Sequence, residues 1–407
     1  MEVSIKPSAL MLILLILILT LPVGSRSTQQ EGEGFIFDER WRFKAEEGVR
    51  EVAISLDGGE VVAGGKGYTA YFNVENGDPL WMFNRNDFVD SLAMSPEGEY
   101  IAVGMEHAML HLFKGEEGLY WSLRTEGPVL CLSISDENQL TAGTFFGSIY
   151  SINCESKKVN WIYRLQNQEA VLSIAISLNG EVVAAGTSND RILILNEDGE
   201  AVTDFKINGF PYSLELSNDG RLLAVASNSS FIYLFDLEGK RCVWSYKTGA
   251  SVRSVDITSN GSFVVAGSHD GYVYCINIAG EVYWSYKTGG KVKEVFISPD
   301  DRLVFAGGTD RQVYAFKLGS GRCLASYRLP QWVTSISSSQ DGDVVAIGAR
   351  GYVILLDFTQ SKSTSMEAVE EAGGTYIYTT SIALAIIAAI FITLLYRRWG
   401  SGDGDGK

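Results

Sequence analysis

The sequence predicts an all-β protein, an eight-bladed β-propeller, because two landmarks recur together about every forty residues and short strand-like segments lie between them. The first landmark is a tryptophan, as in CVWSYKTGA at 242–250 and VYWSYKTGG at 282–290. The second is a turn that begins with Ser or Thr, such as SNDGR at 217 and SPDDR at 298. Both landmarks count eight units, which is why we predict eight blades.

The tryptophans are interpreted as structural positions of the repeat, since their regular spacing accounts for all of them. They are Trp41, Trp81, Trp121, Trp161, Trp244 and Trp284, and Phe205 and Ala325 stand at the two remaining places. The turns begin at 55, 95, 135, 177, 217, 258, 298 and 339. Two independent landmarks that stay in step over this length indicate one repeated structural unit.

Each unit divides into four short strands. In residues 251–288 the segments SVRSVDI, SFVVAGS, YVYCINI and VYWSYKT are separated by turns rich in Gly, Asn and Asp, which is a hairpin signal. One such sheet has two apolar faces and is unstable alone, whereas copies stacked radially bury both faces and leave only short edges. We therefore expect four-stranded blades over residues 35–358.

The two ends of the repeat region predict how the ring closes. After the eighth turn the chain supplies only three strands, which end with GYVILLDF at 351–358. The missing strand is FIFDERWRF at 35–43, at the start of the region. Pairing the two removes the loose edges that an open ring would expose. We expect this N-terminal strand to complete the last blade.

Segments outside the repeats predict a single-pass protein of the cell membrane with its propeller outside the cytoplasm. Residues 1–25 resemble a signal peptide, with an uncleaved anchor as the alternative. Residues 376–396 are apolar and uncharged over about 21 residues, enough for a transmembrane helix. Residues 397–407 begin with two arginines, which places this tail in the cytoplasm. The polar stretch 359–374 is expected to be a flexible tether.

Composition excludes some functions and leaves few candidate sites. The net charge of −16 and pI near 4.7 argue against nucleic-acid binding. The segment GGKG at 64–67 opens no predicted helix, so it does not fit a phosphate-binding loop. We predict no catalytic, cofactor-binding or metal-binding residues. Two sequons, at Asn228 and Asn260, lie in turns of the predicted outward-facing domain and are possible glycosylation sites.

Two repeat families share these motifs. The turn, followed by LLAVAS or FVVAGS and then YLFD or ILLD, resembles a WD40 repeat, with Phe235-Asp236 and Leu356-Asp357 at the place of the Trp-Asp pair. The segments FDLEGKRCVWSYKTG and INIAGEVYWSYKTG resemble the tryptophan-docking repeat of quinoprotein (PQQ-type) propellers. This resemblance covers residues 35–358. It implies an eight-bladed ring in which each tryptophan packs between neighbouring blades.

The function expected from these features is a non-enzymatic, membrane-tethered scaffold or envelope interaction module with a monomeric ectodomain and protein or envelope partners. Propellers with these repeats, which the sequence resembles, include a periplasmic scaffold subunit of outer-membrane assembly machinery. Quinoprotein enzymes of this type hold PQQ with a disulfide of adjacent cysteines, a stacking Trp and calcium, and this sequence has no adjacent cysteine pair. The alternatives are a PQQ-binding oxidoreductase and a ligand-binding sensor that works through a membrane partner.

Overall fold

The computed structural model describes residues 34–46 and 48–361, which form short antiparallel strands and two single-turn 3-10 helices, η1 (Gly115–Glu117) and η2 (Gln166–Gln168). The first fifteen strands are β1 (Phe35–Lys44), β2 (Val49–Ile54), β3 (Val61–Phe72), β4 (Pro79–Met94), β5 (Tyr100–Met105), β6 (Met109–Lys114), β7 (Gly118–Arg124), β8 (Val129–Ile134), β9 (Gln139–Thr144), β10 (Ser148–Asn153), β11 (Lys158–Arg164), β12 (Val171–Ile176), β13 (Val182–Thr187), β14 (Arg191–Asn196) and β15 (Ala201–Lys206). The remaining strands are β16 (Pro211–Leu216), β17 (Leu222–Ser227), β18 (Phe231–Asp236), β19 (Arg241–Lys247), β20 (Val252–Ile257), β21 (Phe263–Ser268), β22 (Tyr272–Asn277), β23 (Val282–Lys287), β24 (Val292–Ile297), β25 (Leu303–Gly308), β26 (Gln312–Lys317), β27 (Cys323–Arg328), β28 (Val333–Ser338), β29 (Val344–Ala349) and β30 (Tyr352–Gln360).

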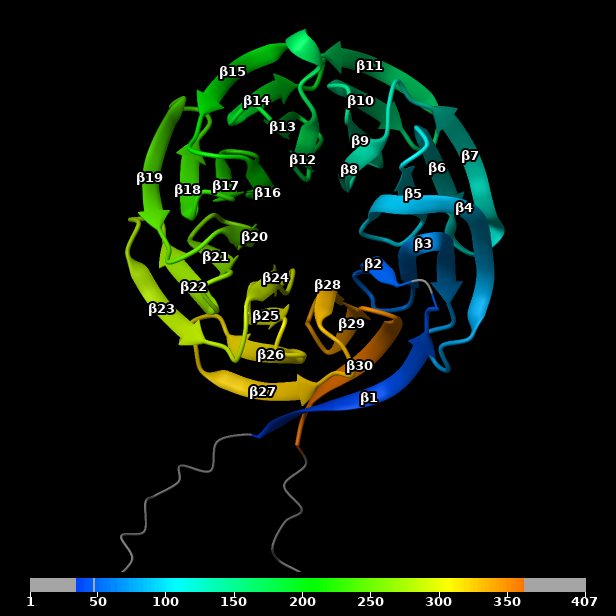
Figure 1. Ribbon diagram of the computed structural model, residues 1–407, viewed down its shortest axis with the longest axis vertical. Helices are drawn as coiled ribbons and strands as arrows, with labels where there is room; N and C mark the ends of the chain where they lie inside the picture. The colour runs from blue at the N-terminus through cyan, green and yellow to red at the C-terminus, as the bar shows by residue number, and fades with distance from the viewer. Residues whose placement is uncertain (1–33, 47, 362–407) are drawn as a thin grey trace, which may run out of the picture. The chain divides into compact units, whose positions relative to one another are not determined.

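The strands of residues 35–360 form seven sheets arranged radially around a common axis (Figure 1). Six sheets have four strands and one, β2 to β7, has six. In the regular sheets the first strand of each repeat lies nearest the axis and the last lies on the outside of the ring, as β20 and β23 do. The all-β prediction and its four-stranded repeats are therefore confirmed.

The Ser-led turns fix where the first strand of each repeat ends. In SNDG the Ser217 hydroxyl donates to the Asp219 carboxylate at 2.7 Å, and the same carboxylate oxygen accepts the N–H of Arg221 at 3.1 Å. Gly220 follows with φ of +69°, a conformation that glycine adopts without a steric penalty. Local hydrogen bonding of this kind explains why the turn recurs as a sequence signature.

The six-stranded sheet departs from the repeat because two of its strands are long. β3 has 12 residues and β4 has 16, whereas β5 and β6 have six each. β4 pairs with β3 through Pro79 to Asn84 and with β5 through Val89 to Met94. Seven hydrogen-bonded sheets are thus observed, and the predicted number of eight blades stays a prediction.

The ring is closed by the two ends of the repeat region. β1 pairs antiparallel with β30, from Phe35 opposite Gln360 to Lys44 opposite Tyr352, and so becomes the outer strand of the sheet β28–β30. Arg40 reinforces this pairing with a 2.5 Å ion pair to Asp357. The strand closure expected from the sequence is confirmed by this register.

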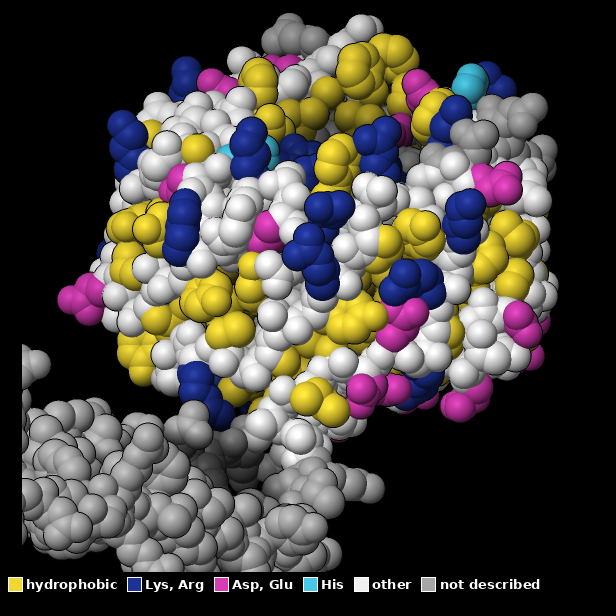
Figure 2. Space-filling view, turned by 60° about the horizontal axis from the view of Figure 1, so that its bottom comes forward, with side chains coloured by type: hydrophobic (Ala, Val, Ile, Leu, Met, Phe, Trp, Pro, Cys, Tyr) yellow, Lys and Arg dark blue, Asp and Glu magenta, His cyan; other side chains and the backbone are white. Residues whose placement is uncertain are grey.

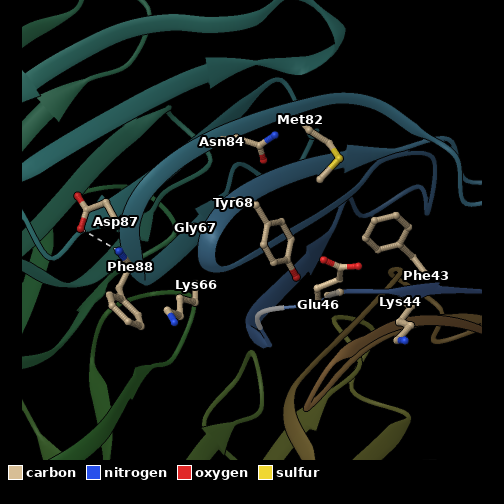
Figure 3. Close-up of a pocket in the computed structure, with 11 residues that line it drawn as sticks. Phe43, Lys44, Glu46, Lys66, Gly67, Tyr68, Met82, Asn84, Asp87 and Phe88 are labelled. Carbon is tan, nitrogen blue, oxygen red and sulfur yellow. Dashed lines mark hydrogen bonds between the residues drawn. The ribbon is translucent and has the colours of Figure 1, made fainter.

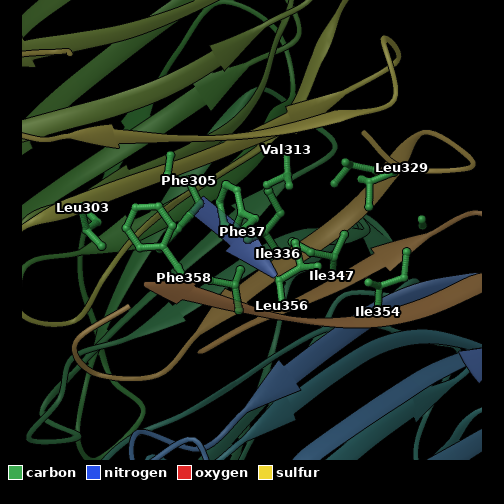
Figure 4. Close-up of a cluster of buried hydrophobic side chains, with 14 residues drawn as sticks. Phe37, Leu303, Phe305, Val313, Leu329, Ile336, Ile347, Ile354, Leu356 and Phe358 are labelled. Atoms are coloured by element: carbon green, nitrogen blue, oxygen red, sulfur yellow. The ribbon is translucent and has the colours of Figure 1, made fainter. Parts of the chain in front are cut away.

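Hydrophobic side chains fill the spaces between successive sheets. At the closure, Phe37 of β1 lies 4.9 Å from the ring of Phe358 and 6.4 Å from that of Phe305, so β1 packs against the neighbouring sheet β24–β27 as well as its own (Figure 4). On its other side Trp41 and Phe43 pack on Phe72 of β3. A single N-terminal strand therefore stabilises both flanks of the closing sheet.

Several sequence predictions fall outside the described residues. They concern the signal peptide at 1–25, nearly all of the tether at 359–374, the transmembrane helix at 376–396 and the tail at 397–407. Within residues 34–46 and 48–361, no helix has the length and apolar character to span a membrane.

Candidate binding face

The antiparallel sheets give the ring two different faces, which we name by their connections. The loop face carries the links from the outermost strand of one repeat to the innermost strand of the next, such as 288–291, and the turns between second and third strands, such as 269–271. The turn face carries the two remaining sets of turns, such as 258–262 and 278–281. Side chains on the two faces differ in charge and in character.

The acidic charge of the protein is concentrated on the turn face, where acidic residues outnumber basic ones. Its acidic residues include Asp57, Asp78, Glu97, Glu116, Glu117, Asp136, Glu137, Glu155, Glu197, Asp198, Asp219, Glu238, Glu281, Asp300, Asp301, Asp341 and Asp343. Many of them, such as Asp219 and Asp341, bond to backbone N–H groups of their own turn. These hydrogen bonds hold the pKa of the Asp341 carboxyl below its usual value, against the effect of burial.

Basic residues encircle the loop face at its outer edge. Seven outer strands end in Lys or Arg, at Lys44, Arg124, Arg164, Lys206, Lys247, Lys287 and Arg328. The register shows that these positions are equivalent, since Lys287 lies opposite Tyr272 as Arg328 lies opposite Gln312. Asn84 of β4, opposite Tyr68, occupies the same place in the six-stranded sheet. This ring was not predicted from the sequence, although a basic residue three positions after most of the repeat tryptophans signals it.

Exposed aromatic side chains also gather on the loop face. Phe88, Phe145, Phe146, Phe210 and Tyr212 are between 37% and 50% exposed and lie in its connections or at the start of an innermost strand. Around the hollow near the top of Figure 2, hydrophobic side chains alternate with Lys and Arg. Exposed rings of this size, mixed with cations, are typical of protein-binding surfaces.

Cation–π contacts hold several of these groups together near the axis. The Arg253 guanidinium lies 4.4 Å from the centre of the Tyr212 ring. Arg350 and the Lys293 ammonium lie 4.9 and 5.4 Å from the Trp332 ring centre. Each contact is worth about 0.5–1 kcal/mol at an exposed site, so these side chains are partly ordered before any partner arrives.

Four carboxyl groups, Glu51, Glu215, Asp256 and Glu294, line the axis on innermost strands. Burial raises the pKa of Glu51 to about 7 and that of Glu294 to about 8, and it also raises the pKa values of Glu215 and Asp256. Their oxygens accept hydrogen bonds from neighbouring strands: Glu51 from Leu92 N–H at 2.5 Å and Asp256 from Ile297 N–H at 2.7 Å.

Serines at equivalent positions of other innermost strands make the same kind of bond to the next sheet. The Ser213 hydroxyl accepts the Val255 N–H at 3.3 Å, Ser254 accepts that of Val295 at 3.2 Å, and Ser335 accepts that of Val52 at 3.2 Å. The innermost strands are edge strands, and these side chains bond backbone groups that would otherwise lack partners. The axial carboxyl groups are thus part of a structural seam between sheets.

The repeat tryptophans dock on the next repeat at the turn face. The indole N–H of Trp284 donates to Leu318 O at 2.7 Å, and that of Trp161 donates to Glu197 O at 2.7 Å. A Cβ on Gly321 or Gly199 of those turns would lie within 3 Å of the indole ring, so only glycine admits the contact. Corresponding bonds join Trp41 to Val74, Trp81 to Gly115 and Trp244 to Ile278, and Trp121 packs in the core with Tyr150.

The remaining predicted residues lie apart from one another. Asn228 is on the loop face, where its side-chain oxygen accepts the Phe210 N–H at 2.8 Å, whereas Asn260 is on the turn face and accepts the Ser262 N–H at 2.9 Å. His107 contacts Asp87, His111 contacts Ser122 and His269 contacts Ser251. Over the part of the chain that the structure describes, no three His, Cys, Asp or Glu side chains are grouped to hold a metal ion.

Comparison with known proteins places the chain among propellers. The family model described as outer membrane protein assembly factor BamB matches residues 70–286 and 228–379. The U3 small nucleolar RNA-associated protein 18 homolog of Homo sapiens is 24% identical over 152 residues, which make up 36% of this chain and 27% of that protein. The chain therefore matches only about a quarter of the length of this relative.

Two solved structures share the fold. Sqt1 from Chaetomium thermophilum superposes with a TM-score of 0.70 at 14% identity, covering 79% of this chain and 98% of that one. The computationally designed Ika8 protein superposes with a TM-score of 0.68 at 15% identity, covering 81% of this chain and all of that one. At these identities the likeness is one of fold.

Proposed function

The chain belongs to the family of the outer membrane protein assembly factor BamB, and on this premise we propose that it is a non-enzymatic scaffold that binds other proteins through its loop face. The family description names a role in assembly, and the chain is a PQQ-like and WD40-like β-propeller of the same repeat type. A propeller of this kind provides fixed positions for many loops, which suits it to protein binding.

The observation that carries the proposal is the difference between the two faces. The loop face combines exposed Phe145, Phe146 and Phe210 with a ring of basic residues, whereas the turn face is acidic and several of its carboxylates, such as Asp219 and Asp341, bond to their own turns. Aromatic residues and Arg are the groups most enriched where proteins bind, and they are present here on a rigid frame. We infer that partners contact the loop face with acidic and apolar groups.

We infer further that the ring has eight blades and is tethered outside the cytoplasm. The blade count rests on β3 and β4, each long enough to serve as two strands of the repeat, so that the six-stranded sheet supplies two blades. The tether rests on the apolar segment 376–396 followed by Arg397 and Arg398, and the orientation on the apolar N-terminal segment. Proteins or other components of the cell envelope are then the expected partners.

A quinone-dependent oxidoreductase fits the residues poorly. The chain has no adjacent cysteine pair, and the described repeat tryptophans bond or pack within the protein. The axial Glu51 and Asp256 carboxylates are engaged by backbone N–H groups of neighbouring sheets. These residues do not form the ligand set that PQQ and calcium require, and we derive no reaction from them.

The test is photo-cross-linking of the full-length chain in native membranes from matched positions on the two faces. A photoreactive residue replaces Phe145 or Phe210 on the loop face, and Leu178 or Ile278 on the turn face; all four are exposed hydrophobic side chains. We expect a defined partner adduct from the loop face only. Adducts of equal yield from both faces, or from the turn face alone, would contradict the proposal.

A further inference from the structure

A pocket of about 690 Å³ lies where the six-stranded sheet departs from the repeat. Its apolar lining comes from Phe43, Met82 and Phe88, and its polar lining includes Tyr68 and Asn84 (Figure 3). The size is within the range of pockets that hold small ligands or a few residues of a peptide. Both the turn in β3 and the link within β4 that border it belong to the loop face.

Near the pocket, the β3 strand departs from the residue pattern of the regular sheets. Tyr68 of β3 pairs with Asn84 in the same way that Tyr272 of β22 pairs with Lys287, so the two tyrosines are equivalent. Two residues further along, Ala70 is therefore equivalent to Tyr274 of β22 and Tyr314 of β26. Two tyrosine rings that fill the regular sheets thus have an alanine as their counterpart here. The close contact at Gly65, where a Cβ would meet Gly48 O at 2.0 Å, is kept from the repeat, since a Cβ on Gly308 would meet Lys291 O at 1.9 Å.

The Tyr68 hydroxyl is a buried polar group without a hydrogen-bond partner at the wall of this pocket. Its side chain is 7% exposed, and the hydroxyl oxygen accepts and donates no hydrogen bond. Figure 3 shows it pointing toward the side of the pocket where Glu46 lies. A buried group of this kind destabilises the free protein, so a ligand that accepts a hydrogen bond from the Tyr68 hydroxyl offsets that cost.

The charges around the pocket balance. Two lysines, Lys44 and Lys66, line the pocket on opposite sides of Tyr68 (Figure 3). Two acidic residues, Glu46 and Asp87, also line it. Asp87 is held by the Phe88 N–H at 2.8 Å and by His107 Nδ1 at 2.5 Å. Asn84, which replaces the Lys or Arg of the other outer strands, offers an amide that matches a peptide group in hydrogen bonding. A neutral ligand suits this lining better than an ion.

Building on the proposed function, we propose that this pocket binds an uncharged, extended segment of a partner protein, with one large apolar side chain beside Phe43 and Met82 and a backbone carbonyl on the Tyr68 hydroxyl. Asn84 then pairs with the adjacent peptide group of the segment. The basic ring and the exposed aromatics make the remainder of the interface. The irregular sheet therefore supplies a specific anchoring point on the loop face.

The test uses the methionine methyl groups of the full-length chain, which has only seven methionines, and a set of short peptides. Acetyl-Gly-Gly-Phe-Gly-Gly-amide is titrated while the ¹³C-methyl resonance of Met82, assigned with Met82→Leu, is followed. We expect a saturable shift at Met82 with a dissociation constant of about 1 mM, and none at Met105, which is buried in another cluster. The Ala analogue of the peptide should leave Met82 unchanged.

Tyr68→Phe separates the proposal from a merely structural role of this tyrosine. We expect the variant to bind the Phe peptide at least about five-fold more weakly and to melt about 2 °C higher, because it loses an unsatisfied hydroxyl. Tyr314→Phe, whose hydroxyl donates to Asp310 at 2.8 Å, is the control and should melt lower without affecting binding. Unchanged binding by Tyr68→Phe, or a lower melting temperature, overturns the proposal.

The peptide charge provides a second criterion. A response of Met82 only to a peptide with Glu in place of Phe would assign the pocket to an anionic ligand and overturn the proposal. The outcome is separable from that of the proposed function. Partner adducts from Phe145 and Phe210 without peptide binding at Met82 would leave the scaffold role intact and remove only the pocket.

Discussion

In the sheets β20–β23 and β24–β27 an aspartate at the loop face ties three chain segments together, whereas β3 has a lysine at the same register position. Asp310 accepts the Tyr314 hydroxyl at 2.8 Å, the Gly289 N–H at 3.0 Å and the Gln312 N–H at 3.2 Å. Asp270 makes the corresponding bonds in the preceding sheet. In β3 the equivalent residue is Lys66, a cation whose ammonium lies 5.5 Å from the centre of the Phe88 ring.

The difference shows how one unit of a repeat protein departs from the others. Where the repeat sequence is kept, the Thr288 hydroxyl also bonds Gly271 O and Gly290 O at 2.9 Å, so it ties the link between sheets to the neighbouring turn. Where Arg85 and Asn86 replace the Thr-Gly pair, the link stays extended inside β4 and a pocket opens beside it. The regular sheets supply rigidity, and the exception supplies a cavity.

The largest expected effect comes from removing the strand that supports both regions. Deletion of residues 35–43 takes away β1, which packs on Phe305 and Phe358 on one side and on Phe72 on the other. We expect loss of the cooperative thermal unfolding transition, measured by circular dichroism and calorimetry. If the shortened protein melts at the temperature of the intact one, ring closure does not stabilise either region.

The second prediction compares the two register-equivalent positions directly. Asp310→Ala removes the acceptor of the Tyr314 hydroxyl and of the Gly289 and Gln312 N–H groups, and we expect the free energy of unfolding to fall by about 2–3 kcal/mol. Lys66→Ala, at the same place in β3, should change it by less than about 0.5 kcal/mol because the Lys66 side chain is exposed. Urea denaturation measures both, and equal effects would show that the two regions do not differ as described.

The third and smallest effect concerns the axial carboxyl groups Glu51 and Glu294, one in each region. Their pKa values are raised to about 7 and about 8 from 4.5, so the folded state binds these protons more tightly than the unfolded chain. The stability that each contributes is complete below pH 4.5 and is lost as pH rises through the folded-state pKa.

The matching experiment compares Glu294→Gln and Glu51→Gln with the unsubstituted chain at pH 5 and pH 8. We expect the free energy of unfolding of each variant, relative to that of the parent, to rise by about 1–2 kcal/mol from pH 5 to pH 8. The effect is no larger because both side chains are only half-buried and keep some contact with solvent. Subtracting the parent curve removes the contribution of other carboxylates. A difference that does not change with pH would show that neither carboxyl group titrates between pH 5 and pH 8.

The fold was accessible from the sequence because its signals are local. The hydroxyl of Ser217, the carboxylate of Asp219 and the backbone of Gly220 define a turn within four residues, and the tryptophan marks the outer strand a fixed distance later. The closure by residues 35–43 followed from counting strands. The candidate face was only partly accessible: a basic residue three positions after Trp121, Trp161, Trp244 and Trp284 was visible, but its meaning required knowing where the outer strands end.

The sequence by itself determined the repeat, its strands and turns and the pairing of its two ends, because short-range hydrogen bonds and alternating apolar residues encode them. Only the tertiary structure decided that basic and aromatic groups share one face, that axial carboxyl groups bond neighbouring sheets, and that Tyr68 is buried without a partner. These properties depend on residues brought together from separate repeats, such as Phe43, Tyr68 and Met82 at the pocket. Whether the Tyr68 hydroxyl finds a hydrogen-bond partner depends on which residues lie next to it in space, and the sequence around Tyr68 does not specify those residues.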